Sequence, residues 1–160
     1  GKLLAQTAMK DGKEVTFMPA YGAEVRGGAP NRMVIISDKL IASPVIGRPS
    51  VLIAMNGISL ERGVARLKHN GPRLVHSTLS RQRPHIADTV ELLKIPADDI
   101  AAELGTPKAA NMVMLGAYLK KSRILSTETA AKCLPDMMPG QKPAVLSVNA
   151  EALARGASLA

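Results

Sequence analysis

Two kinds of hydrophobic spacing alternate along the chain and divide it into short helices and strands. Residues 2–10 place apolar side chains on one helical face, whereas residues 14–18 alternate between polar and apolar positions, as a strand does. Gly12 suits the left-handed position that ends the first helix, and Pro19 ends the first strand. The pattern predicts strands at residues 14–18, 32–37, 51–55, 73–76 and 90–95. It predicts helices at residues 2–10, 59–67, 98–104, 107–121, 127–134 and 142–153.

The order of these elements predicts the fold class. Strands that alternate with helices favour an α/β fold in which a mostly parallel sheet has helices on both faces. Four consecutive apolar residues at 33–36 indicate that the second strand is buried on both faces. The length of 160 residues suits a single domain that covers residues 1–160.

The helix predicted for residues 107–121 is apolar on nearly every side, so we expect it to be buried. Thr106 is the expected N-cap, with Pro107 at the first helical position. Gly116, at the centre of this helix, would allow another backbone to approach closely. Ser126 is the expected N-cap of the next helix.

Composition excludes several classes of protein. No apolar run approaches the roughly 18 residues that a membrane-spanning helix needs. A single cysteine excludes an internal disulfide framework and an iron–sulfur cluster built from this chain alone, and it favours a reducing, cytoplasmic compartment. Three aromatic residues are too few for stacking platforms on single-stranded nucleic acid, so no nucleic-acid partner is expected.

The net charge of +8 favours an anionic partner. Residues 62–85 contain five arginines, one lysine and all three histidines but no acidic residue. This basic segment suits a phosphate group or an acidic partner, and it equally suits a solvated surface. The histidines are spaced too widely to ligate one metal from a single helix or strand, and Cys133 is interpreted as a small buried side chain. We therefore expect neither catalytic nor metal-ligating residues.

The most informative segment is YGAEVRGGAPN at residues 21–31. It follows a predicted strand, and ligands of open α/β sheets bind at the carboxyl ends of strands. Its glycines would leave backbone N–H groups exposed or let another chain approach closely. A purely structural turn explains the same spacing.

This segment, together with the strand MVIISD, Ser43-Pro44 and the later VLIAMN, resembles the gamma subunit of 2-oxoacid:ferredoxin oxidoreductases. The resemblance covers nearly the whole chain and is looser over residues 62–85. It implies a Rossmann-like fold in an assembly that decarboxylates a 2-oxoacid, transfers the acyl group to coenzyme A and reduces ferredoxin. Pyruvate, 2-oxoglutarate and branched-chain oxoacids all stay open as substrates.

The resemblance also implies which subunits of the assembly hold the cofactors. Thiamine diphosphate and the iron–sulfur clusters would be held by thiamine-binding and ferredoxin-like partner subunits. This chain would bind neither, would be inactive alone, and would serve assembly and coenzyme A binding. Isolated chains could also associate with one another. Family members open with a strand and a Gly-rich loop, so we expect that central strand and that phosphate-facing loop ahead of Gly1.

The candidate cofactor-binding residues are those of the glycine-containing segment and two polar residues at predicted helix starts. They are Lys2, Tyr21, Gly22, Glu24, Arg26, Gly27, Gly28, Asn31 and Asn56. Lys2 would place a cation at a helix N-terminus, which suits a phosphate group.

Two other functions are compatible with these residues. The chain could be the small subunit of an indolepyruvate oxidoreductase, although the segment at 21–31 usually looks different there. It could also be a free-standing Rossmann-like nucleotide-binding module, which would bind NAD without a partner protein.

Overall fold

The computed structural model describes residues 1–19, 31–68, 73–76 and 92–160. Its α-helices are α1 (Lys2–Lys10), α2 (Gly57–Val64), α3 (Ala97–Glu103), α4 (Ala110–Ser122), α5 (Thr127–Lys132), α6 (Leu134–Met137) and α7 (Pro143–Ala157). A 3₁₀ turn, η3 (Pro107–Ala109), leads into α4. The strands are β1 (Glu14–Pro19), β2 (Arg32–Ser37), β3 (Leu52–Ala54), β4 (Arg73–His76) and β5 (Leu92–Ile95).

The described strands form two sheets, so the fold is mixed α/β. Strands β3, β4 and β5 are parallel in that order, whereas β1 and β2 form an antiparallel pair in which Glu14 faces Ser37 and Pro19 faces Arg32. The predicted mostly parallel order therefore holds for β3, β4 and β5, and the antiparallel β1–β2 pair departs from it. A parallel neighbour requires a crossover, usually helical, and no helical pattern separates these two strands in the sequence.

Strand β2 also differs from its prediction in burial. Residues 33–36 are half-buried rather than fully buried. Among the described strands β2 pairs only with β1, so its second edge is not covered by a further strand.

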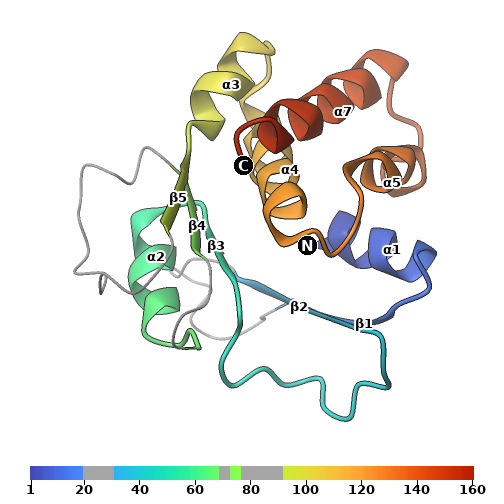
Figure 1. Cartoon of the computed structure of the whole chain (residues 1–160). Helices are drawn as coiled ribbons and strands as arrows, with labels where there is room; N and C mark the ends of the chain where they lie inside the picture. Colours follow the sequence, from blue (N-terminus) through green and yellow to red (C-terminus); the bar gives the residue numbers. More distant parts are fainter. Residues whose placement is uncertain (20–30, 69–72, 77–91) are drawn as a thin grey trace.

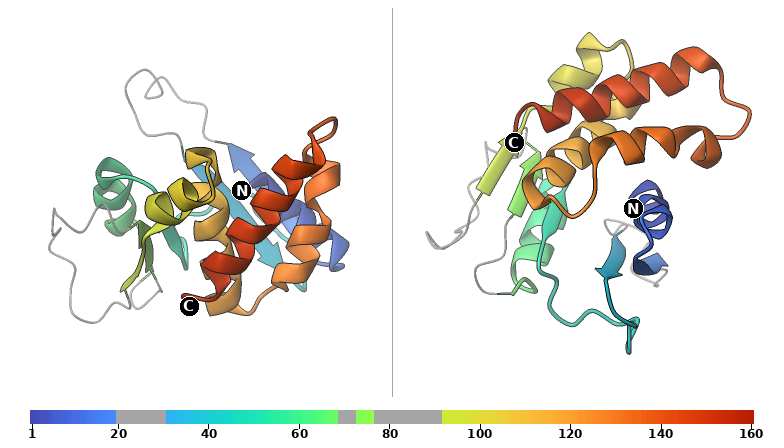
Figure 2. Two further views of the ribbon diagram at one scale, coloured as in Figure 1. Left: turned by 90° about the horizontal axis from the view of Figure 1, so that it is seen from above. Right: turned by 45° about the vertical axis from the view of Figure 1, so that its right-hand side comes forward.

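The helices form a layer beside the two sheets. Figure 1 shows α4 and α7 side by side, with α1 between this layer and the β1–β2 pair, and Figure 2 shows the same arrangement from two further directions. In both figures α2 lies on the side of β3–β5 that faces away from α4. The main core lies mostly within the helical layer, and its largest fully buried side chains include Ile95, Met114, Leu119, Leu134 and Leu153.

Helices α4 and α7 touch through their backbones at two glycines. A Cβ added at Gly116 would overlap the carbonyl group of Leu153, and one added at Gly156 would overlap the carbonyl group of Val113. Both overlaps are closer than real Cβ contacts, and backbone atoms cannot move aside as a flexible side chain can. The prediction that Gly116 permits close approach, in a buried helix, is confirmed.

Several local signals act as the sequence predicts. Gly12 has the left-handed φ of 75° that ends α1. The hydroxyl of Ser126 accepts a hydrogen bond from the N–H of Thr129 at 3.0 Å and caps α5, and the free thiol of Cys133 is fully buried.

Several helix boundaries differ from their predictions; the helix predicted at residues 59–67, for example, is α2 at Gly57–Val64. Thr106 makes no side-chain cap, and Pro107 begins a 3₁₀ turn before α4. The helix predicted to run through residue 134 ends at Lys132, and Pro135 lies in the first turn of α6, where its missing N–H needs no helical partner. Helix α7 continues to Ala157 because its last turns pack on α4.

Across the described part of the chain, none of the helices has both the length and the apolar character that crossing a bilayer demands.

The glycine contact generates a stability prediction. Gly116→Ala and Gly156→Ala should each lower the free energy of unfolding by about 2–3 kcal/mol, because the added methyl group forces the two backbones apart. Gly47→Ala is the matched control, since its Cβ would meet no atom within 4 Å. Urea denaturation measures all three; equal midpoints for Gly116→Ala and Gly47→Ala would contradict the backbone contact.

A second prediction concerns the start of α2, where the side-chain oxygen of Asn56 accepts a hydrogen bond from the N–H of Ser59 at 2.8 Å. Asn56→Ala should cost about 1 kcal/mol of stability, whereas Asn56→Ser should keep most of it because serine also caps. Asn111→Ala, at an exposed position in the first turn of α4, is the control and should not destabilise. Equal stability of the alanine and serine variants at position 56 would show that the cap contributes nothing.

Candidate functional site

Helix α1 begins against the end of the β1–β2 pair. A Cβ built on Gly1 would lie 2.9 Å from Cε2 of Phe17 on β1 and 3.3 Å from Cβ of Arg32 on β2. At this end of the pair, Pro19 faces Arg32. The end of β1 at Pro19 and the start of β2 at Arg32 therefore both lie beside the N-terminus of α1.

This arrangement brings together two of the predicted site residues, Lys2 and Asn31, and adds Arg32. Lys2 and Arg32 are exposed. A guanidinium nitrogen of Arg32 donates a hydrogen bond to the backbone carbonyl of Asn31 at 3.1 Å. The sequence did not single out Arg32, because only the strand pairing places it beside the start of α1.

The electrostatics of this corner favour an anion. Helix α1 has no acidic residue in its first turn and no side-chain cap, so the partial positive charge of its N-terminus is uncompensated by its own side chains. Lys2 and Arg32 add two full positive charges at the same end. A phosphate or carboxylate group would be bound there by charge and by backbone N–H groups.

Six of the predicted site residues lie outside the described residues, and their roles stay predictions. They are Tyr21, Gly22, Glu24, Arg26, Gly27 and Gly28. Of the basic segment at 62–85, the side chains of Arg62, Arg66 and Lys68 are described, and all three are exposed.

Asn56 belongs to a different part of the fold. It follows β3 and caps α2, and α2 packs mainly on β3. Helix α1 instead packs mainly on β1, β2, α5 and α6. The observed role of Asn56 is therefore structural, and its predicted role with a cofactor stays a prediction.

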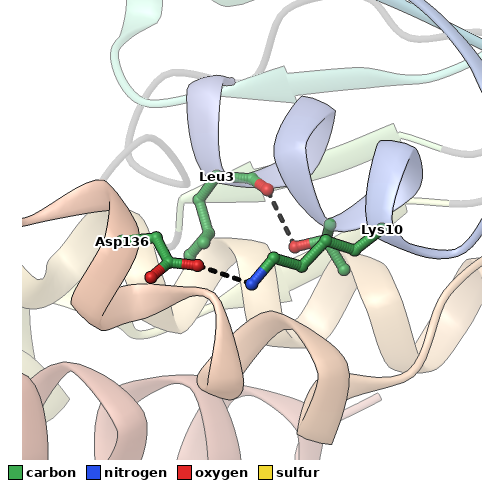
Figure 3. Close-up of polar contacts among 4 residues, drawn as sticks. Leu3, Lys10 and Asp136 are labelled. Atoms are coloured by element: carbon green, nitrogen blue, oxygen red, sulfur yellow. Dashed lines mark hydrogen bonds and ion pairs between the residues drawn. The ribbon is translucent and has the colours of Figure 1, made fainter.

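A shallow depression of about 550 Å³ extends from the start of α1 along its outer face. It is lined by Lys2, Ala5, Gln6, Met9, Lys10, Phe17 and Met137. At one end of this depression, Nζ of Lys10 forms an ion pair with Oδ2 of Asp136 on α6, at a distance of 2.5 Å (Figure 3). The hydrogen bond in this ion pair raises the pKa of Lys10. No sequence signal could have found this pair, because its members are 126 positions apart.

The side chains described by the structure offer binding groups rather than a reactive centre. Among them, no three histidine, cysteine, aspartate or glutamate residues gather to hold a metal ion. Cys133 is buried within the helical layer, away from solvent. The corner at α1 can attract and orient an anion, and no nucleophile with an adjacent base is described there.

Comparison with known proteins identifies the family. The sequence pattern of the family described as pyruvate ferredoxin/flavodoxin oxidoreductase matches residues 1–159. The ketoisovalerate oxidoreductase subunit VorA of Methanothermobacter thermautotrophicus is 37% identical over 119 residues, which are 74% of this chain and 24% of VorA. The chain thus spans about a quarter of the length of that relative.

Two solved structures share the fold. The gamma subunit of a keto/oxoacid ferredoxin oxidoreductase from Geobacter sulfurreducens superposes with a TM-score of 0.82 and 28% identity, covering 98% of this chain and 86% of that one. The 2-oxoglutarate:ferredoxin oxidoreductase of Magnetococcus marinus, solved with 2-oxoglutarate, coenzyme A and succinyl-CoA bound, gives a TM-score of 0.85 at 26% identity, covering 99% of this chain and 27% of that one. With its pattern matched from residue 1 to residue 159, this chain belongs to the pyruvate ferredoxin/flavodoxin oxidoreductase family.

Proposed function

We propose that this chain is the gamma-type component of a cytoplasmic 2-oxoacid:ferredoxin oxidoreductase. In this assembly a 2-oxoacid is oxidatively decarboxylated, its acyl group passes to coenzyme A, and ferredoxin is reduced. The observation that carries the proposal is the similarity to the Geobacter sulfurreducens gamma subunit over 98% of this chain.

The proposal assigns the redox chemistry to partner subunits. Iron–sulfur clusters are held by cysteine thiolates, usually four, and these 160 residues contain one cysteine, which is buried. The clusters would therefore be held by ferredoxin-like subunits, and we assign thiamine diphosphate to thiamine-binding subunits. The chain described here contributes shape, docking area and part of an anion-binding surface.

The positive corner at α1 is the proposed contribution to coenzyme A binding. Coenzyme A is rich in phosphate, and the Magnetococcus marinus relative was solved with it bound. Lys2, Arg32 and the first-turn N–H groups of α1 fit a phosphate group, because no acidic side chain opposes them in that turn. Asn31 and the segment at residues 21–28 would supply the remaining contacts of this chain with coenzyme A.

We also propose that the two sheets are parts of one Rossmann-like sheet. Within the described residues, β2 and β3 each have a single hydrogen-bonded neighbour. Val34, Ile36, Val51 and Ile53 pack against the main core but stay only partly buried. One further strand between β2 and β3 would pair both edges and cover these side chains.

Reconstitution of the complex from its subunits tests whether the redox chemistry resides in the partner subunits. The isolated chain should not oxidise any 2-oxoacid, whereas its mixture with the thiamine-binding and ferredoxin-like subunits should reduce ferredoxin in the presence of a 2-oxoacid and coenzyme A. Activity of the pure chain, or full activity of the other subunits without it, would refute the proposal.

Charge reversal at the α1 corner tests the coenzyme A contribution in the reconstituted complex. Lys2→Glu should raise the KM for coenzyme A about threefold to tenfold, because it replaces an attraction at a helix N-terminus by a repulsion. The KM for the 2-oxoacid should not change. Lys108→Glu, at an exposed position on η3, is the matched control; equal effects of both substitutions on the KM for coenzyme A would exclude this corner.

A further inference from the structure

The connection between β2 and β3 is a long segment without regular structure. Residues 38–51, which we call the connecting arm, contain neither helix nor strand. Figures 1 and 2 show it extending from the sheets on the side opposite the helical layer. Irregular loops of this length inside a compact domain are uncommon and are usually functional.

The connecting arm exposes large apolar side chains. Leu40 is 85% exposed and Val45 is 67% exposed, more than the other large exposed hydrophobic residues among those described. Each is followed by a half-buried isoleucine, Ile41 or Ile46. Two such pairs place four apolar side chains within positions 40–46, whereas exposed hydrophobic residues scattered singly need no explanation.

The arm is held at both ends and shaped between them. At its start, the ammonium of Lys13 pairs with Asp38 at 2.7 Å. Near its end, the N–H of Lys68 donates to the carbonyl of Pro49 at 3.0 Å. Between these anchors, the hydroxyl of Ser43 accepts a hydrogen bond from the N–H of Val45 at 3.2 Å. Leu40 and Val45 are therefore presented on a pre-shaped segment, which reduces the entropy lost when a partner binds.

The charges of the arm indicate what it contacts. Its one acidic residue, Asp38, is neutralised by Lys13, whereas Lys39 and Arg48 are exposed and have no acidic partner among the described residues. The arm thus combines apolar side chains with two available cations. A complementary surface has an apolar pocket with carboxylates at its rim.

The comparisons supply a candidate partner for this surface. The matched region makes up 24% of VorA and 27% of the Magnetococcus marinus chain, so in both proteins it is continuous with a much larger polypeptide. We propose that the connecting arm docks on the part of the oxidoreductase that corresponds to the rest of those chains. Leu40 and Val45 enter its apolar pocket, and Lys39 and Arg48 pair with carboxylates at the rim. This inference rests on the proposed function.

The experiment measures binding of the full chain to the purified oxidoreductase subunit that corresponds to the remainder of VorA. Leu40→Asp and Val45→Asp should each weaken binding by about tenfold or more, because each places a charge in a desolvated pocket. Arg48→Glu should mainly slow association and reduce its dependence on salt. Leu159→Asp is the matched control, since Leu159 is 42% exposed near the C-terminus, and it should bind like the wild type.

The outcomes separate this inference from the proposed function. All variants should keep the wild-type melting temperature, because the replaced side chains are exposed. If the wild type binds and the two arm variants bind equally well, the arm is not the docking segment although the proposed function stands. If the wild type does not bind the subunit, the proposed function fails together with the inference. If the arm variants lose only self-association of the isolated chain, the arm joins two copies of this chain and the inference is wrong.

Discussion

The contact on which the structure depends is the backbone approach of α4 and α7. Gly116 lies against Leu153, and Gly156 lies against Val113, so each helix contributes one glycine and one carbonyl group to the same interface. The absence of two Cβ atoms lets the helices approach until their main chains touch, which buries the centre of α4 on nearly every side. Helices α3, α5 and α6 also pack on α7, so this pair organises the helical layer.

The helical layer in turn positions the corner that attracts anions. Leu3, Leu4 and Ala8 bury one face of α1 in the core. Thr7 is buried with them, and its hydroxyl is satisfied because it donates to the carbonyl of Leu3 at 2.8 Å. With this face held, the N-terminus of α1 is fixed beside Arg32. The positive corner is therefore a consequence of core packing, and its proposed role is to bind an anion.

Much of the secondary structure could be predicted because its causes are local. The apolar face of α1, the left-handed Gly12 after it and the Ser126 cap of α5 depend on residues within a few positions of each other. The sequence between β1 and β2 contains no helical pattern, which already favours an antiparallel pair over a parallel crossover. Which strand edges meet could not be predicted in this way, because it depends on how the elements pack in space.

For the candidate site, the sequence by itself determined the family motif at residues 21–31, the excess of positive charge and the cation of Lys2 at a helix start. Only the tertiary structure decided that Arg32 lies beside this helix, that Asn56 acts as a cap elsewhere, and that Lys10 reaches Asp136. Periodicity and capping act over one or two turns of chain, so a linear pattern records them. Contacts between residues dozens of positions apart depend on how the elements pack, and no local pattern records that.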